Sequence, residues 1–393
     1  MKLSKPWNRL PSELKLLIIE MAIDDGRWED LTRLEAILQV DRECHQLAAP
    51  IFWKSITLDE RRFDTLFDLS PATRRHVRFV ETEQRYASSL RPIVVEHIAT
   101  RDALYRVLAQ LPPLEGVDDL LAHFLTADEL PFDYFAHKVL SKLTRIRLPV
   151  ATLGLPVLVR LNPLHLRHLV LNLSLVFRVD LRPTFQALAS FQSLTHLGLF
   201  GNPGQSILLE LAQISLPLRS LRLLLDRIRS DEVQRSQIGA TLTHFPTLEF
   251  VDLWLEDKGL PPPPVQLPCL RHLKLLNRDT LLLLTLFHDC PLEILDVDGL
   301  YWPMDFDRAG LINQVEHFGE TLEVVILTDS FFDELSSKLH ERIIRVRDEC
   351  GFALIWKGES PDIWWTDLDG LDDYQVGWKR GGSGIISDEA WHG

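Results

Sequence analysis

The chain has few of the groups that build covalent or metal-bound frameworks. Its four cysteines lie far apart and form no C-x-x-C pair: Cys44, Cys269, Cys290 and Cys350. This pattern argues against a disulfide framework or a zinc site and fits a reducing compartment. Purely aliphatic runs, such as Leu281 to Leu284, are far shorter than the roughly 20 residues of a membrane span. With no apolar secretory signal at the start, we expect a soluble protein of the cytoplasm or nucleus.

Basic residues are also scarce relative to acidic ones. The chain has 42 Lys and Arg against 56 Asp and Glu, a formal net charge of −14. Binding to phosphates needs a basic face, and no dense Lys/Arg run supplies one. We therefore expect neither nucleic acid nor a membrane as partner, and a basic protein surface is the better electrostatic match. Hydrophobic residues make up 46%, which is ordinary for a chain that buries a core.

Motifs of catalysis and of cofactor binding are missing as well. The sequence contains no G-x-S-x-G and no H-E-x-x-H, and Gly201-Asn202-Pro203-Gly204 lacks the lysine of a phosphate loop. We expect no catalytic residue, no metal and no cofactor. The chain is predicted to act by binding rather than by catalysis.

Apolar residues recur at helical spacing in the first fifty residues. Pro11 suits the first turn of a helix, and the stripe that follows it contains Leu14 and Ile18. A second helix is predicted from Asp30 to Val40, and a third carries the chain to Phe52 before an extended segment. Three short helices make a small core. Part of this apolar surface should therefore contact the next domain or a partner.

This N-terminal segment resembles the F-box, the module that docks the Skp adaptor of SCF-type ubiquitin ligases. The matching residues are Leu10-Pro11, Glu13-Leu14 and Ile18-Ile19, with the closing segment from Ile51 to Leu58. Asp41 stands where the family usually has serine, and Cys44 stands where an aromatic residue is common. The resemblance implies that the adaptor, and through it a cullin ligase core, contacts Leu10, Pro11, Leu14, Ile18, Val40, Leu47, Ile51 and Trp53.

A six-residue pattern, Leu-x-x-Leu-x-Leu with Ile or Val allowed, occurs eight times from residue 143 onward. The copies begin 22 to 30 residues apart, at Leu143, Leu166, Leu194, Leu218, Leu248, Leu270, Leu292 and Leu322. These intervals approximate the ~20–29-residue period of leucine-rich repeats. Each copy is predicted to form one strand whose leucines enter a core shared with neighbouring repeats. We expect an α/β solenoid: a three-helix F-box-like module followed by an irregular leucine-rich-repeat horseshoe.

Segments between and around the copies complete the predicted organisation. Return helices are expected at 185–191, 207–214, 233–242, 280–288 and 311–318, and a capping helix with a final strand at 332–356. A strand is expected at 76–80, and helices at 93–111, 117–124 and 134–143. The predicted domains are 1–58 for adaptor docking, 59–142 as a mostly helical connector with irregular first repeats, 143–357 for the repeats and cap, and 358–393 as an acidic, tryptophan-containing tail.

Residues between the leucines of each copy should point out from the concave face of the horseshoe. Aromatic and charged residues at such positions are typical of interface anchors. We predict that a target protein contacts His196, Phe200, Arg222, Phe250, Asp252, Trp254, Lys274 and Asp296. The alternative is that neighbouring loops or the acidic tail cover these residues. His168, His196 and His272 share one column, but Ser220 and Phe250 separate them, so no zinc site is expected.

Combined, the docking segment and the repeats resemble F-box proteins with leucine-rich repeats, of the fungal type. This resemblance implies a substrate-recognition subunit of an SCF-type E3 ubiquitin ligase, with a protein target that the sequence does not identify. The alternative is a leucine-rich-repeat scaffold or inhibitor that never joins a ligase.

Overall fold

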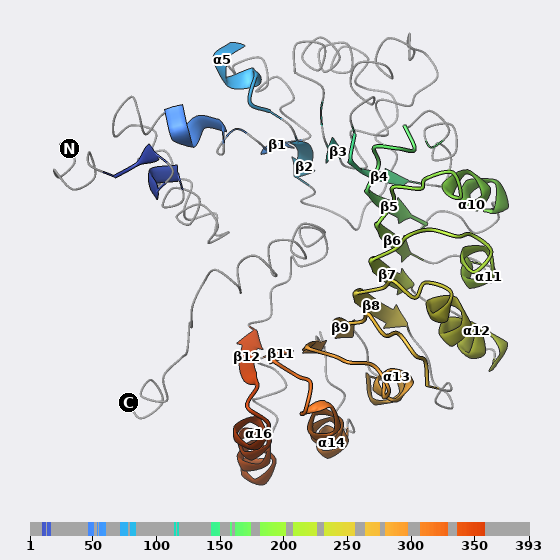
Figure 1. Ribbon diagram of the computed structural model, residues 1–393, viewed down its shortest axis with the longest axis vertical. Coiled ribbons are helices and arrows are strands. Elements are labelled where there is room, and N and C mark those ends of the chain that lie inside the picture. The colour runs from blue at the N-terminus through green and yellow to red at the C-terminus, as the bar shows by residue number, and fades with distance from the viewer. Residues whose placement is uncertain are drawn as a thin grey trace.

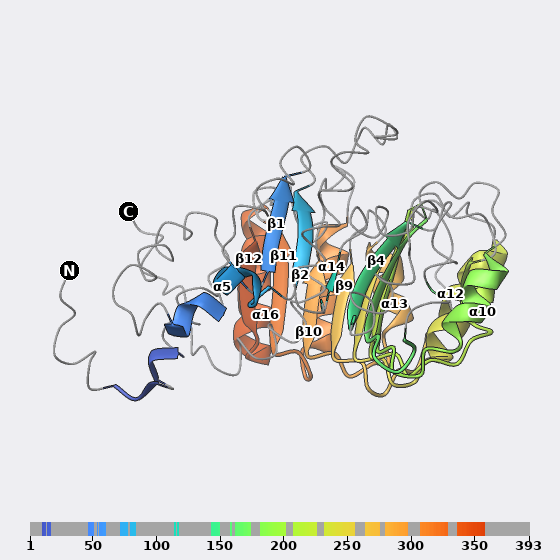
Figure 2. The ribbon, with the colours of Figure 1, turned by 90° about the horizontal axis from the view of Figure 1, so that it is seen from above.

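The computed structural model describes residues 10–12, 14–16, 46–50, 53, 55–59, 71–77, 79–83, 114, 116–117, 143–149, 158, 162–173, 181–201, 207–225, 232–255, 264–275, 280–297, 307–328 and 336–357. Within them, twelve strands form one sheet in which every strand pairs in parallel with the next strand of the sequence (Figure 1). The strands stand side by side in a curved sheet (Figure 2). This is the arrangement of a solenoid whose units contact only their neighbours.

The sheet begins with three strands that precede the eight predicted copies. These are β1 (Ser55–Asp59), β2 (Phe79–Glu83) and β3 (Gly116–Val117). The eight copies then supply β4 (Arg145–Pro149), β5 (His168–Asn172), β6 (His196–Gly201), β7 (Ser220–Leu225), β8 (Phe250–Leu255), β9 (His272–Leu275), β10 (Ile294–Val297) and β11 (Val324–Thr328). The terminal strand is β12 (Ala353–Lys357).

Leucine columns explain why the copies stack. Leu169, Leu197 and Leu221 are paired in register across β5, β6 and β7, and the column continues through Val251 and Leu273. All five are fully buried in one continuous core. Because each strand can bury its leucines only against its neighbours, the repeats stabilise one another. The prediction of a leucine-rich-repeat solenoid is confirmed for this part of the chain.

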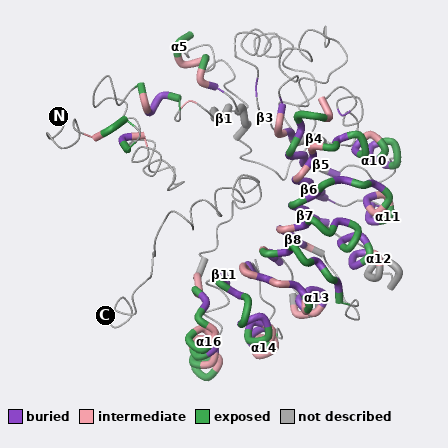
Figure 3. Tube along the Cα trace, in the orientation of Figure 1, coloured by how far each residue is buried: buried purple, intermediate pink, exposed green. Residues whose placement is uncertain are grey.

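Helices cover the convex side of the sheet (Figure 1). They are α10 (Arg182–Leu188), α11 (Ile207–Leu211), α12 (Glu232–Thr243), α13 (Thr280–Leu286), α14 (Arg308–Phe318) and α16 (Ser337–Cys350), and a short α5 (Pro71–Arg74) lies between β1 and β2. In α10, α11 and α14 most large apolar residues face the sheet and are buried, whereas the outward side, which includes Leu209 of α11, is exposed (Figure 3). These helices match the predicted return segments within a few residues.

The last two helices, α14 and α16, have capped ends. Asp307 accepts a hydrogen bond from the Gly310 backbone N–H at 2.8 Å, and Ser336 caps α16 through the Leu339 N–H. Such N-caps satisfy backbone donors that a helix leaves free. Gly351 ends α16 with φ of 80°, a left-handed conformation that glycine adopts without a Cβ clash.

Some predicted elements differ from the structure or fall outside it. Val117, which was expected to begin a helix, instead belongs to β3. The helix predicted at 93–111, the rest of the one predicted at 117–124, most of the one at 134–143, and the acidic tail lie outside the described residues. The strand predicted at 76–80 is present as β2, shifted by a few residues.

Candidate functional site

The concave face of β5 to β10 presents three rows of side chains that run across the strands. In register, the first row contains His168, His196, Ser220, Phe250, His272 and Ile294, and the second contains Val170, Gly198, Arg222, Asp252, Lys274 and Asp296. The third row includes Phe200, Leu224 and Trp254 at the carboxyl ends of the strands. Parallel pairing in register therefore brings together all eight residues that the sequence predicted as target contacts.

Charges alternate along the second row. The Arg222 Nε atom donates to Asp252 Oδ2 at 2.8 Å, and Lys274 Nζ lies 3.8 Å from Asp296 Oδ2. All four side chains are buried, and Asp252 is fully buried. Burying an ion is costly unless an opposite charge compensates it. The alternation of two cations and two anions makes the row electrically neutral as a whole.

Aromatic and imidazole rings pack along the first row. The rings of His168 and His196 are stacked, with centroids 4.0 Å apart and an interplanar angle of 7°. Phe250 contacts His272 edge to face at 4.6 Å, and the Arg222 guanidinium lies 5.9 Å from the Phe250 centroid. Burial, with added repulsion from nearby cations, lowers the pKa of His168 and of His272 to about 3. Both imidazoles are therefore neutral at pH 7.

A small apolar cluster forms separately from the main core. Val170, Phe200 and Leu224 are buried together, and the half-buried Trp254 packs against them. Gly198 makes this packing possible, because a Cβ at this position would lie 2.8 Å from Phe200 Cε2. The cluster gives the concave face an apolar stripe beside its charged row.

The residues predicted to contact a target are largely buried in the described structure. Seven of the eight predicted contact residues are buried, and Trp254 is half-buried rather than exposed. The ion pair of Arg222 with Asp252 and the stacked rings of His168 and His196 lie within this buried face. Target binding by these eight residues stays a prediction.

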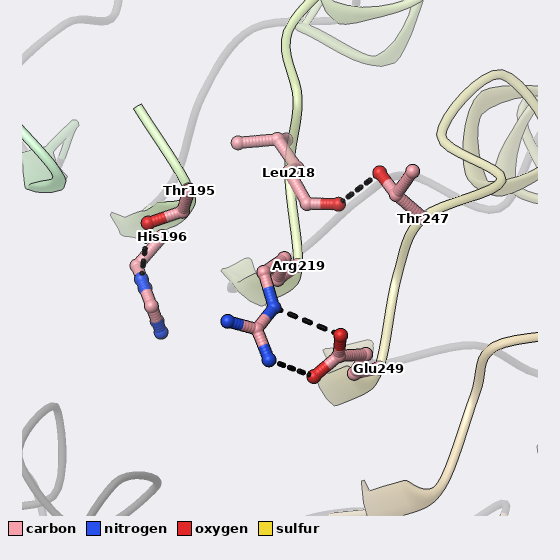
Figure 4. A network of polar contacts seen from close by, with 6 residues as sticks. All are labelled: Thr195, His196, Leu218, Arg219, Thr247 and Glu249. Atoms are coloured by element: carbon pink, nitrogen blue, oxygen red, sulfur yellow. Dashed lines mark hydrogen bonds and ion pairs between the residues drawn. The ribbon is translucent and has the colours of Figure 1, made fainter. Parts of the chain in front are cut away.

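Exposed ion pairs flank the first row at the amino ends of the strands. Arg219 forms two hydrogen bonds with Glu249, at 2.8 and 2.6 Å (Figure 4). Arg271 pairs with Glu293 at the amino ends of β9 and β10. Thr195 Oγ1 lies 2.8 Å from His196 Nδ1 in the same region. The two ion pairs, and the Thr247 hydroxyl that donates to the Leu218 carbonyl, link consecutive repeats, whereas the Thr195–His196 contact lies within one repeat.

Residue types of a hydrolytic triad are present on the concave face, but the register separates them. Phe250 on β8 stands between Ser220 on β7 and His272 on β9, so the hydroxyl and the imidazole are not neighbours. A nucleophile must be within hydrogen-bond reach of its base. Among the described residues, no group of three His, Cys, Asp or Glu side chains is arranged to hold a metal ion.

The described part of the N-terminal segment is a helical turn. The backbone N–H groups of Leu14 and Lys15 donate to the Pro11 carbonyl, each at 3.1 Å. Leu14 is exposed and Leu10 half-buried, whereas the half-buried Trp53 packs against the solenoid core. Leu47 lies half-buried in a helical stretch at 46–50. The other predicted adaptor contacts, Ile18, Val40 and Ile51, lie outside the described residues.

Comparison with known proteins gives a likeness of fold. No protein-family model matches the chain, and no curated protein matches it. The leucine-rich repeat-containing protein LegL7 from Legionella pneumophila is a similar solved structure, with 13% sequence identity and a TM-score of 0.44. The match covers 78% of this chain and 91% of that chain. The solenoid character of the described residues rests on the parallel sheet and the leucine columns above. Within the described residues, no helix is both long and apolar enough to cross a membrane.

Proposed function

We propose that this protein is the substrate-recognition subunit of an SCF-type E3 ubiquitin ligase. The N-terminal helices dock a Skp-type adaptor and thereby join the cullin ligase core, and the concave face of the solenoid holds the target protein. The chain itself contributes no catalytic group. It accelerates ubiquitin transfer by holding the target near the reacting centre, because proximity alone gives a large rate gain.

The observation that carries this proposal is which side chains are exposed in the turn that begins at Pro11. Leu14 is 47% exposed, whereas the adjacent Lys15 is only 3% exposed. A surface turn normally shows the opposite pattern, because lysine is among the residues least often buried. An outward leucine beside an inward lysine is expected where the apolar side of the turn faces a partner.

The connection between this turn and the solenoid also supports the proposal. Trp53 packs against the repeat core, and β1, which begins at Ser55, pairs directly with β2. The segment that closes the F-box-like module is thus part of the sheet. A receptor needs such a stiff connection, because the target must be held at a fixed place relative to the ligase core.

Copurification with a Skp-type adaptor tests the proposal. The full chain should retain the adaptor, and Leu14→Asp should abolish retention because it places a charge in an apolar contact. Leu209→Asp is the matched control, since Leu209 on α11 is 46% exposed but lies on the convex side of the solenoid. Failure of the unmodified chain to retain the adaptor would leave a leucine-rich-repeat scaffold or inhibitor outside any ligase.

A further inference from the structure

Three buried polar atoms around Phe250 have no hydrogen-bond partner in the part of the chain that the structure describes. They are Ser220 Oγ, Asp252 Oδ1 and His272 Nε2. Ser220 and His272 flank Phe250 in the first row, and Asp252 follows two residues after Phe250 on the same strand. Buried polar atoms are nearly always hydrogen-bonded in folded proteins. Three such atoms on three adjacent strands therefore point to a group that this face binds.

The surrounding charges restrict the chemistry of that group. Asp252 already shares its other carboxylate oxygen with Arg222, and Lys274 and Asp296 form the next pair of the neutral second row. A charged group placed here would have no net charge to compensate it, which is costly in a buried setting. The ligand group is therefore uncharged.

Hydrogen-bonding capacity restricts the group further. The Asp252 carboxylate oxygen can only accept, so the ligand must donate to it. The Ser220 hydroxyl can donate, so the ligand can also accept. A neutral His272 imidazole can do either, depending on its tautomer. A carboxamide carries an NH₂ donor and a carbonyl acceptor side by side and meets these requirements.

We infer that the patch formed by Ser220, Phe250, Asp252 and His272 binds the side-chain carboxamide of an asparagine or glutamine in the target protein. This inference rests on the proposed function, because it names the chemistry that the concave face selects. Ser220, Phe250 and Asp252 are all buried, so entry of the ligand requires side chains of this patch to move apart. The apolar cluster of Val170, Phe200, Leu224 and Trp254 lies beside the patch. Trp254 of this cluster follows Asp252 by two residues on β8, about 6.6 Å along a strand, so the target carries an apolar residue two positions from the amide that Asp252 accepts from.

Fluorescence anisotropy with labelled peptides tests this inference on the full chain. The probes are extended heptapeptides with leucine at position six and Gln, Asn, Glu, Lys or phosphoserine at position four. The Gln or Asn peptide should bind at least tenfold more tightly than each charged peptide. Equal affinities, a preference for a charged peptide, or no binding by any peptide would overturn the inference.

Two serine variants separate the amide site from a general effect on folding. Ser220→Ala should weaken the Gln peptide about tenfold without lowering the thermal unfolding midpoint, since the lost hydroxyl has no partner among the described residues. Ser190→Ala is the control, because that hydroxyl bonds the Ala187 carbonyl on the convex side. Unchanged peptide affinity in Ser220→Ala would contradict the inference. The adaptor experiment gives a separate result. If the chain binds the adaptor but shows no preference for the amide peptides, only this inference fails. If it prefers the amide peptides but does not bind the adaptor, only the ligase role fails.

Discussion

Removal of the Asp252 carboxylate should be among the most destabilising single changes on the concave face. The side chain is fully buried, and its partner Arg222 is also buried, with 2.8 Å between Nε and Oδ2. Register places Lys274 on the other side of Asp252. Asp252→Ala would therefore leave two buried cations flanking an empty position. Breaking a buried pair by removing one partner costs about 3–5 kcal/mol.

The same two strands provide a matched control. Arg219 and Glu249 join β7 and β8 by an exposed ion pair three residues before the buried one. Glu249→Ala should cost at most about 1 kcal/mol, because water already solvates and screens exposed pairs. Urea unfolding, followed by circular dichroism, measures the difference as a shift of midpoint at unchanged m-value.

A double-mutant cycle separates the ion pair from other effects of the substitution. Arg222→Met combined with Asp252→Leu should recover most of the stability lost in Asp252→Ala, because apolar residues of similar size carry no desolvation cost. The reasoning would be refuted if Asp252→Ala cost no more than Glu249→Ala. It would be refuted equally if the double variant were as unstable as the two single losses together.

Three further predictions concern other parts of the solenoid. The pKa of His168 is lowered from 6.5 to about 3, so the unfolded chain binds a proton that the folded chain excludes between these values. The free energy of unfolding should therefore fall as pH decreases below 6.5, by about 2 kcal/mol at pH 5 from this residue. His168→Gln should make the urea midpoint depend less on pH. Identical pH dependence in the variant and the unmodified chain would contradict this. Gly319→Ala should destabilise by about 1–3 kcal/mol because the new Cβ overlaps Cys350 Sγ, and adding Cys350→Ala should restore the melting temperature. Leu273→Ala, in the fully buried column of β9, should lower the unfolding free energy by about 2–5 kcal/mol, and a loss below 1 kcal/mol would argue against a shared core.

Most of the solenoid could be predicted because one pattern sets both local structure and packing. A leucine such as Leu197 favours a strand and also occupies the buried column that fixes its neighbours. The first strands were harder to predict: β3 contains only Gly116 and Val117, and so short a strand carries no repeated pattern. The parallel pairing of β1 with β2 likewise depends on contacts between segments that share no sequence repeat.

The rows of the concave face could be predicted, but their burial could not. Spacing within a copy shows which side of the sheet Arg222 and Asp252 occupy. Their ion pair joins positions 30 residues apart and depends on strand register, which the repeat pattern alone does not give. The sequence also did not predict that Gly198 leaves room for the Phe200 ring, because the ring lies back along its own strand over that residue.

The most direct test of the account is hydrogen–deuterium exchange of the full chain with and without a Skp-type adaptor. Adaptor docking at the N-terminal helices predicts slower exchange in the turn at 10–16 and unchanged exchange in β5 to β10, because the concave face is kept for the target. Protection confined to the concave strands, or no protection anywhere in the chain, would contradict the proposed division between an adaptor-docking module and a target-binding solenoid.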